Sequence, residues 1–179
     1  MPEALVQLLG IMPAPQSPRA AMGDWSMVIS TLGTALPGDY VDFINCYGTG
    51  CISQFLWIHN PFEANVHLCL LSRYSVILDA DLDIRTSFPE EIPQPLFPEP
   101  GGLLPFATTD NGDRIYWLTK GAPESWTVVV WESRGPHYAE FAMTMTRFLC
   151  GWLGGNLHVP MFSPADWQPI FEQNPSYFT

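Results

Sequence analysis

The chain has 179 residues, of which 7 are Lys or Arg and 18 are Asp or Glu, so its formal net charge is −11. Binding to nucleic acid requires cationic side chains that neutralise phosphates, so this balance argues against a nucleic-acid partner and equally against an anionic membrane surface. Charged residues make up only 14% of the chain and aromatic residues 13%. This composition predicts a surface with many uncharged groups that is prone to association.

The cysteine pattern and the first residues of the chain indicate which cellular compartment the protein occupies. The four cysteines form no CxxC pair: they are Cys46, Cys51, Cys69 and Cys150. The chain starts without the basic segment of a secretory signal, so we expect reduced thiols in a cytoplasmic protein. The uncharged stretch 43–62 has the length of a membrane-spanning helix. Its polar residues, glycines and proline instead predict a buried core segment.

Helices are predicted in the first part of the chain. Residues 3–9 have a short helical pattern, and the prolines that follow predict a stiff extended arm. Asp24 is placed to cap a helix at 25–32, which Gly33 ends. A further helix begins at Pro37. Its apolar side chains recur at spacings of three and four and so share one face: Tyr40, Phe43, Ile44 and Tyr47.

One strand and one long helix are predicted next. Residues 51–58 are expected to form a single strand with both faces partly covered. Residues 60–63 (Asn-Pro-Phe-Glu) have the cap, the proline and the acid of a helix start, so a helix is predicted from there to about Arg85. Within it, Asp81 and Arg85 are expected to form an i, i+4 ion pair. Its apolar stripe consists of Val66, Leu70, Tyr74, Ile77, Leu78 and Leu82.

A proline-rich crossing and a hairpin follow. Closely spaced prolines in the segment 89–100 exclude a helix or a central strand there. Strands are predicted at 103–108 and 114–118. They flank Asn111-Gly112, a strong hairpin signal because both residues tolerate a positive φ.

The last predicted elements complete the fold class. A third strand is expected at 126–132 and a fourth around Phe141. A helix from Thr144 to about Leu153 and one capped helical turn at 163–166 follow. The predicted order along the chain is helices, a strand, a helix, a meander and a helix. This order is typical of an α+β fold with an antiparallel sheet, since a parallel sheet needs regular βαβ alternation.

Motifs for covalent or phosphate chemistry are missing from the sequence, which has no GxSxG, SxxK, HExxH or GxxxxGK. The histidines fall on different predicted elements, so no Cys–His pair is favoured: they are His59, His67, His137 and His158. Partly exposed or hydrogen-bonded histidines are the simpler interpretation.

The sharpest metal-like pattern is an acidic run. On a calcium-loop template, residues fall at positions 1, 3, 5, 9 and 12: Asp79, Asp81, Asp83, Ser87 and Glu90. Ile84, however, stands where the sharp turn of that loop needs glycine. We favour a solvated acidic helix end, and therefore expect no metal and no cofactor.

A second group of carboxylates surrounds the predicted hairpin. Asp110, Asp113 and Glu132 could lie together there, and paired carboxylates can act as acid and base when one pKa is raised. Turn formation is the commoner role of such residues at a hairpin tip. We therefore predict no catalytic residues.

Several strings together resemble the SUKH superfamily, and the order in which they occur makes the resemblance fairly specific. The opening motif of that superfamily is similar to LPGDY at 36–40, Phe43 and YGTG at 47–50 of this chain. Its central hairpin is similar to LLPFA at 103–107, DNGD at 110–113 and Trp117, and its closing part to WTVVV at 126–130 and Phe148-Leu149. The proline-rich run 95–102 is similar to that of actinobacterial members.

The resemblance implies an α+β fold with a curved antiparallel sheet of about four to six strands flanked by helices, and no catalytic residues. It covers residues 24–155, which leaves an N-terminal helix and proline-rich arm at 1–23 and a proline- and aromatic-rich tail at 156–179, packed on the same domain. The family includes bacterial immunity proteins that neutralise toxins and a eukaryotic branch of cell-wall and signalling regulators.

Charge and resemblance together predict a non-enzymatic protein that occludes a toxin, and the net charge favours a basic one. Its predicted contacts are Asp39, Asp42, Trp57, Asp110, Asp113, Trp117 and Glu132. One alternative is a regulatory or scaffold module that binds an endogenous protein, for example in envelope assembly. The other is an enzyme or metal binder that uses residues 79–90.

Overall fold

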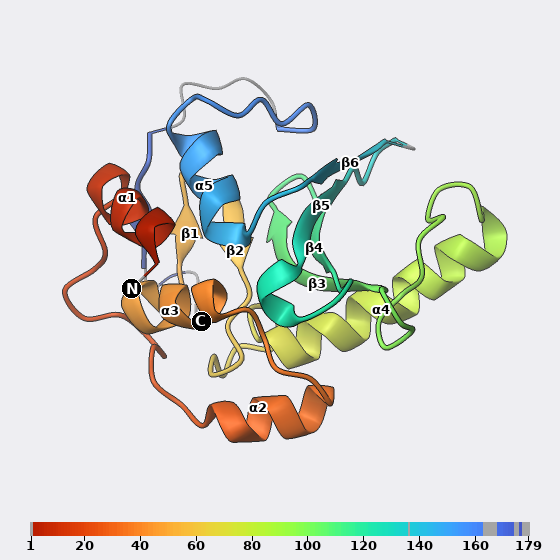
Figure 1. The fold of residues 1–179 in the computed structure, drawn as a ribbon, viewed down its shortest axis with the longest axis horizontal. Coiled ribbons are helices and arrows are strands. Elements are labelled where there is room, and N and C mark those ends of the chain that lie inside the picture. The colour runs from red at the N-terminus through yellow and green to blue at the C-terminus, as the bar shows by residue number, and fades with distance from the viewer. Residues whose placement is uncertain (1, 136, 163–167, 174–175, 177–179) are drawn as a thin grey trace.

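The computed structural model describes the chain except residues 1, 136, 163–167, 174–175 and 177–179. In this part it contains five α-helices, one short 3-10 helix and one seven-stranded sheet (Figure 1). The helices are α1 (Glu3–Ile11), α2 (Trp25–Leu32), α3 (Gly38–Tyr47), α4 (Leu70–Ser87), η1 (Pro123–Ser125) and α5 (Met145–Leu153). The strands are β1 (Cys51–Ile52), β2 (Leu56–Ile58), β3 (Leu103–Thr109), β4 (Arg114–Leu118), β5 (Thr127–Trp131), β6 (Tyr138–Phe141) and β7 (Phe171–Glu172).

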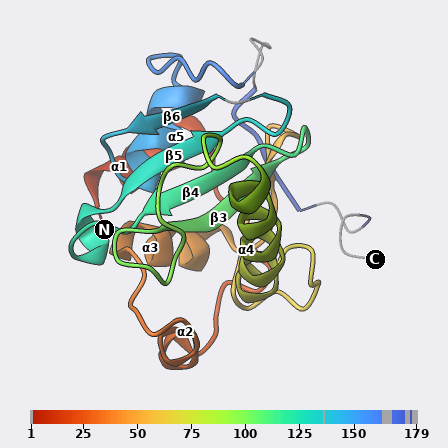
Figure 2. The ribbon, with the colours of Figure 1, turned by 90° about the vertical axis from the view of Figure 1, so that its right-hand side faces the viewer.

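The sheet is antiparallel throughout and has helices on both faces. Its strand order is β6-β5-β4-β3-β2-β1-β7. Along β4, Ile115 and Trp117 join the core cluster that contains α1, α3 and α5, whereas Tyr116 and Leu118 join the cluster that contains Ile77 of α4. Figure 2 shows the strands between α4 in front and α5 and α1 behind. The period-2 alternation of a strand thus divides the core into two layers.

The predicted fold class is confirmed: the chain is α+β, with an antiparallel sheet flanked by helices. The sheet has seven strands, of which β1 and β7 are only two residues long. β7 lies in the C-terminal tail, and it pairs with β1 at one edge of the sheet.

Local signals predicted α2 and α3 accurately. The Asp24 carboxylate accepts a hydrogen bond from the Ser26 N–H at 2.9 Å, which caps α2. Gly33 ends that helix with a left-handed φ of 74°. The predicted apolar face of α3 is fully buried: Tyr40, Phe43, Ile44 and Tyr47. These side chains hold α3 against the sheet.

The prediction of one strand over 51–58 is wrong. The segment forms a hairpin, β1 and β2, with Cys51 opposite Trp57. Ser53 and Gln54 at its tip both have a φ of 55°, and these consecutive left-handed residues reverse the chain in a tight turn. The Phe55 N–H closes this turn by donating to the Ile52 carbonyl at 3.0 Å. Neither Ser53 nor Gln54 is a glycine or an asparagine, so the usual sequence signal for such a turn is missing.

The prediction that the stretch 43–62 lies in the core is confirmed. It forms the end of α3 and the β1–β2 hairpin, and most of its residues are buried. Within the described residues, none of the helices combines the length and the apolar character that crossing a membrane requires.

The predicted start of the long helix at 60–63 is also wrong, because α4 begins only at Leu70. Side chains in the preceding loop bind the backbone two residues further on. The Asn60 oxygen accepts from the Phe62 N–H at 2.9 Å, and the Asn65 oxygen accepts from the His67 N–H at 2.9 Å. Such Asx-type turns compete with helix formation.

The ion pair predicted within α4 does not form. Asp81 is buried and pairs with Arg114 of β4, and it also accepts a hydrogen bond from the Tyr116 hydroxyl at 2.9 Å. Arg85 instead pairs with Glu99 at 2.8 Å. The contacts of Asp81 therefore join α4 to the sheet.

The predicted stripe along this helix is only partly buried. Leu70 and Ile77 lie in the core, whereas Val66 and Leu82 are exposed. Val66 precedes α4, which begins only at Leu70. The C-terminal part of α4, which contains Leu82, extends beyond the sheet (Figure 1). Sequence periodicity alone does not reveal where the supporting surface stops.

The meander in the second half agrees with its prediction. β3 and β4 flank the tip at 110–113, where Gly112 has a φ of 89°. β5, β6 and α5 follow at the expected places, with Thr144 as the N-terminal flanking residue of α5. The helical turn predicted at 163–166 lies outside the described residues.

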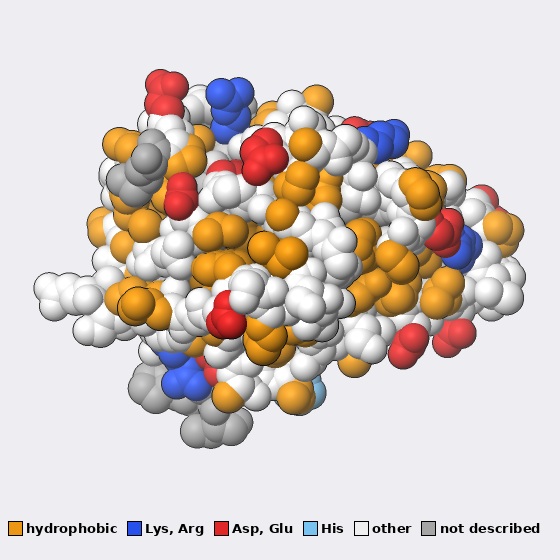
Figure 3. Space-filling view, turned by 60° about the horizontal axis from the view of Figure 1, so that its bottom comes forward, with side chains coloured by type: hydrophobic (Ala, Val, Ile, Leu, Met, Phe, Trp, Pro, Cys, Tyr) orange, Lys and Arg blue, Asp and Glu red, His pale blue; other side chains and the backbone are white. Residues whose placement is uncertain are grey.

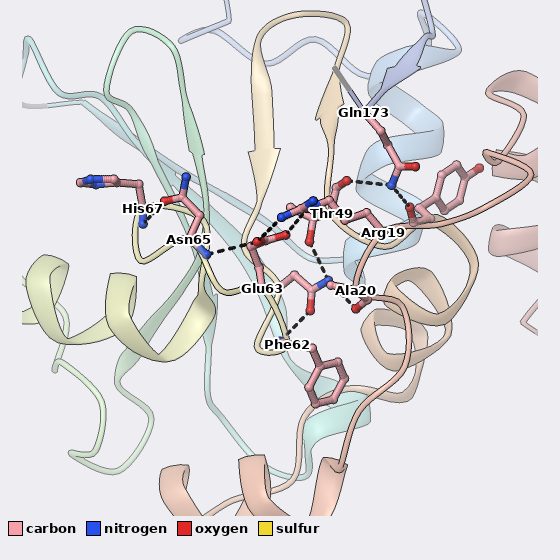
Figure 4. Close-up of polar contacts among 10 residues, drawn as sticks. Arg19, Ala20, Thr49, Phe62, Glu63, Asn65, His67 and Gln173 are labelled. Atoms are coloured by element: carbon pink, nitrogen blue, oxygen red, sulfur yellow. Dashed lines mark hydrogen bonds and ion pairs between the residues drawn. The ribbon is translucent and has the colours of Figure 1, made fainter. Parts of the chain in front are cut away.

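The motif 47–50 lies where both terminal segments approach the domain. The Thr49 N–H donates to the Arg19 carbonyl at 2.8 Å, and the Gln173 side chain donates to the Thr49 carbonyl at 2.8 Å (Figure 4). A Cβ on Gly48 would lie 2.1 Å from the Arg19 carbonyl oxygen, and one on Gly50 would lie 2.6 Å from a tail carbonyl. The two glycines therefore permit close backbone contact with both segments.

A polar network that includes Arg19, Ala20, Thr49 and Glu63 secures the arm (Figure 4). The buried Asn60 amide donates to the Thr49 hydroxyl and to the Ala20 carbonyl, both at 2.9 Å. Beside it, the Arg19 guanidinium forms two hydrogen bonds with the Glu63 carboxylate, at 2.8 and 3.0 Å. Paired geometry of this kind satisfies the buried carboxylate.

We predict that Gly48→Ala lowers the free energy of unfolding by at least about 2 kcal/mol, because the backbone is strained for any other residue and the methyl group overlaps Arg19. The matched control is Gly10→Ala in α1, where a Cβ meets nothing within 4 Å. It is expected to raise stability by about 0.5–1 kcal/mol. Urea unfolding followed by circular dichroism measures both, and equal stability of the Gly48→Ala and wild-type proteins would contradict the prediction.

His59 is a buried histidine with one partner among side chains. Its Nε2 atom lies 3.1 Å from the Thr108 hydroxyl, and its Nδ1 atom has no hydrogen-bond partner among the described residues. Burial, together with the nearby Arg73 guanidinium, lowers the pKa of the imidazole from 6.5 to about 3. The folded protein therefore holds His59 neutral, whereas the unfolded chain protonates it near its ordinary pKa.

Acid is consequently predicted to destabilise the fold between pH 6.5 and about 3, since the unfolded state binds the additional proton. At pH 5 the loss from His59 amounts to roughly 2 kcal/mol, at about 1.4 kcal/mol per pH unit. His59→Gln should reduce the difference in unfolding free energy between pH 7 and pH 5 by about that amount. Urea titrations at both pH values test this, and an unchanged difference in the variant would refute it.

Candidate interaction surfaces

The seven predicted contact residues lie in three parts of the structure. Asp39 and Asp42 lie on α3, and Trp117 lies in the core. The other four lie at one end of the sheet, on β2, at the β3–β4 tip and directly after β5: they are Trp57, Asp110, Asp113 and Glu132. The fold thus brings four of the seven to one end of the sheet.

Trp57 and Asp110 form a direct pair. The indole Nε1–H of Trp57 donates to the Asp110 carboxylate at 2.8 Å. The backbone N–H of Asp110 donates to the Phe55 carbonyl at 2.9 Å, which fixes the start of the hairpin tip against β2. Asp110 is exposed and Trp57 is half-buried, so both residues reach the surface.

Two of the predicted contacts are structural. Trp117 has no exposed surface and stacks on Phe106 at 4.4 Å. Asp113 is 3% exposed, and its carboxylate accepts hydrogen bonds from the Thr109 hydroxyl at 2.8 Å and the Ser133 N–H at 3.1 Å. It therefore joins the hairpin tip to the segment after β5. Neither side chain is available to a partner at the surface.

Glu132 lies directly after β5, beside the edge strand. Its carboxylate lies 2.9 Å from the Nδ1 atom of His137, which is mostly exposed. A surface pair of this kind contributes little stability. Glu132 is half-buried and remains a candidate contact.

Asp39 and Asp42 share a helix but have different environments. The Asp39 carboxylate accepts from both the N–H and the hydroxyl of Thr146 at 2.9 Å, and so it caps the N-terminus of α5. A carboxylate at this position also interacts favourably with the helix dipole. Both side chains line a hollow of about 500 Å³ between α1, α3 and the start of α5, so Asp39 has two roles there.

This hollow, which we call the acidic hollow, contains four carboxylates and one cation among its described lining residues. The carboxylates are those of Glu3, Asp39, Asp42 and Glu124, and the cation is Arg147. A second hollow of about 610 Å³ continues along α1 and α5 and shares Glu3, Ala4 and Arg147 with the first. The two hollows are therefore adjacent, and the excess of negative charge lies in the first.

Sequence reasoning missed Glu3 and Glu124 as members of this site. They belong to the N-terminal arm and to a turn between strands. Their separation along the chain conceals that α1 packs against α5 and that η1 lies beside α3. A solvent-exposed acid on an otherwise apolar helix was the one available signal for Glu3.

The carboxylates, imidazoles and thiols in the part of the chain that the structure describes do not form a metal site. No three His, Cys, Asp or Glu side chains there lie close enough to hold a metal ion. Within the acidic run 79–90, the Asp81 carboxylate already forms an ion pair with Arg114 and a hydrogen bond with Tyr116. Burial, with two nearby acids, raises the pKa of the Cys51 thiol to about 12, which disfavours the nucleophilic thiolate.

A second kind of surface is apolar. Figure 3 shows the side of the molecule from which α2 projects, with hydrophobic side chains spread over it and only scattered charges. Met22, which is 90% exposed, precedes α2, and Met27 and Ile29 on that helix are also exposed. This surface agrees with the low charged fraction of the sequence.

Comparison with known proteins identifies the family. The family model SUKH_6, described as SMI1-KNR4 cell-wall, matches residues 24–149. No curated protein and no solved structure matches the chain. The matched segment contains α2 to α4, the β1–β6 meander and the first half of α5. The chain therefore belongs to the SUKH (SMI1-KNR4) family.

Proposed function

We propose that this protein is a non-catalytic immunity protein that neutralises a basic toxin by occluding it. Membership of the SUKH family supports an immunity or cell-wall-related module. The observation that carries the choice of a basic partner is the acidic hollow, where Asp42, Glu3 and Glu124 line one depression of a chain with a net charge of −11. In this proposal the protein acts in the cytoplasm.

Electrostatics supports a basic partner in two ways. The summed field of an acidic protein attracts a basic one over several ångströms and raises the association rate, an effect that falls with salt. Carboxylates that line a hollow also concentrate the field, because the surrounding protein has a low dielectric constant. Asp42 and Glu124 are suited to this role because they are not occupied in capping, as Asp39 is.

Occlusion requires a binding surface and no chemical step. The two adjacent hollows along α1 and α5 offer space for a loop or a helix of a partner protein. Trp57, Asp110 and Glu132 provide further polar and aromatic contacts at the end of the sheet. We retain the division into the arm 1–23, the domain 24–155 and the tail 156–179 as part of this proposal.

Any toxin gene found beside the gene of this protein provides the direct test. Co-expression of the protein with that toxin domain is expected to protect a host cell, and the two chains are expected to co-purify. Absence of both protection and co-purification rejects the proposal.

Charge reversal in the acidic hollow is expected to slow toxin binding. The double variant Asp42→Lys with Glu124→Lys should lower the association rate at low salt about tenfold, because the steering field reverses locally. The control, Asp79→Lys with Asp83→Lys on the exposed side of α4, changes the total charge equally and should have a much smaller effect. Stopped-flow or surface-plasmon-resonance kinetics at several salt concentrations measure this, and equal effects of the two pairs would exclude the hollow as the contact.

The alternative is a regulatory or scaffold module of envelope assembly. The description of the matching family model as cell-wall favours it. A pull-down that returns an endogenous envelope-assembly protein, in the absence of a neighbouring toxin gene, distinguishes this function from immunity.

A further inference from the structure

We propose that β6 is a docking strand, to which an extended, basic segment of the partner protein adds as an eighth strand of the sheet. The inference rests on the proposed function, because it specifies how the partner binds. It starts from the position of β6, which is the last strand in the order at one edge of the sheet.

The hydrogen-bond register shows which backbone groups of β6 point outward. The Glu132 N–H donates to the His137 carbonyl at 2.9 Å, and Val130 lies opposite Ala139. In an antiparallel pair, hydrogen-bonded and non-hydrogen-bonded positions alternate. The N–H and C=O groups of Tyr138 and Glu140 therefore face away from β5.

This outer edge is uncovered in the part of the chain that the structure describes. No strand pairs there, and Tyr138 is 44% exposed. The strand contains neither a proline nor a lysine, the residues that most commonly protect an edge from pairing, and its one charge is that of Glu140. The edge at the other side of the sheet is β7, which is only two residues long. β6 is thus the longer template for strand addition.

A hollow of about 400 Å³ beside β6 defines the chemistry of the added segment. It is lined by Glu132, His137, Tyr138, Ala139, Pro160 and Met161. The polar side-chain groups among these residues are the Glu132 carboxylate, the exposed imidazole, which lies 2.9 Å from that carboxylate, and the Tyr138 hydroxyl. An arginine or lysine suits this environment, because its aliphatic stem packs on Pro160 and Met161 while its charge pairs with Glu132.

Charge favours a basic partner over a second copy of this chain. Two copies that pair through their β6 strands would bring together two molecules with a net charge of −11 each. The sequence of β6, Tyr-Ala-Glu-Phe, also offers no cation for the Glu132 hollow of the other copy. A basic segment satisfies both the backbone groups and the carboxylate.

The test uses a capped peptide of alternating arginine and valine, labelled with a fluorophore, and the full-length protein. Binding is measured by fluorescence anisotropy, and hydrogen exchange locates it. We expect saturable binding with slower exchange at the amides of Tyr138 and Glu140. The matched peptide with alternate N-methylated amides keeps the charge and loses strand pairing, so it should bind at least about tenfold more weakly. A glutamate–valine peptide should not bind.

Two variants at one position separate the backbone from the charge. Glu140→Pro removes an outward N–H and leaves the bonds to β5 intact, as proline does at an edge, so it should weaken binding at least about tenfold. Glu140→Gln keeps that N–H and should weaken binding only a few-fold. Equal binding of the N-methylated peptide, or no binding of the arginine–valine peptide, overturns the proposal without reliance on any variant.

The remaining outcomes separate this inference from the proposed function. If the wild-type protein sediments as a dimer and Glu140→Pro abolishes that dimer, the edge is assigned to a second copy and the inference is overturned. Full toxin neutralisation by a folded Glu140→Pro variant would also overturn it and leave the proposed function intact. Failure of the wild type to protect against the toxin rejects the proposed function itself, whatever the peptide result.

Discussion

The contact between Trp117 and Tyr40 is the constraint on which the rest of the structure depends. Trp117 stacks on Phe106 within the sheet, and Tyr40 of α3 meets its ring edge-on at 4.9 Å. The Tyr40 hydroxyl then donates to the His59 carbonyl at 2.6 Å. Because these rings are fully buried, their shapes set the position of α3 on the sheet.

The position of α3 in turn decides which acids are available for binding. Asp39 and Asp42 both line the acidic hollow, but the Asp39 carboxylate also caps α5 and so joins two helices. Residues of the same type on one helix thus have different roles. The same distinction applies at the end of the sheet, where Asp113 is buried within a hydrogen-bond network and Asp110 remains exposed.

The segments outside the family match contribute to the surfaces that the proposals use. α1 supplies Glu3 to the acidic hollow, and the segment after α5 supplies Pro160 and Met161 to the hollow beside β6. Conserving a fold while varying its additions is one physical route to different partners, because the added residues change the surface and leave the core intact. The glycines at 48 and 50 permit close contact of the domain with Arg19 of the arm and with β7 of the tail.

The sequence by itself determined the fold class, the capped helix α2, the buried face of α3 and the β3–β4 hairpin, because these depend on periodicity and turn chemistry within a few residues. It did not reveal the β1–β2 turn, since Ser53 and Gln54 take a positive φ without a glycine signal. Only the tertiary structure decided the pairing of Asp81 with Arg114, the burial of Trp117 and the association of Glu3 with Asp42 and Glu124. These relations join residues far apart in the chain, and the packing of whole elements sets them.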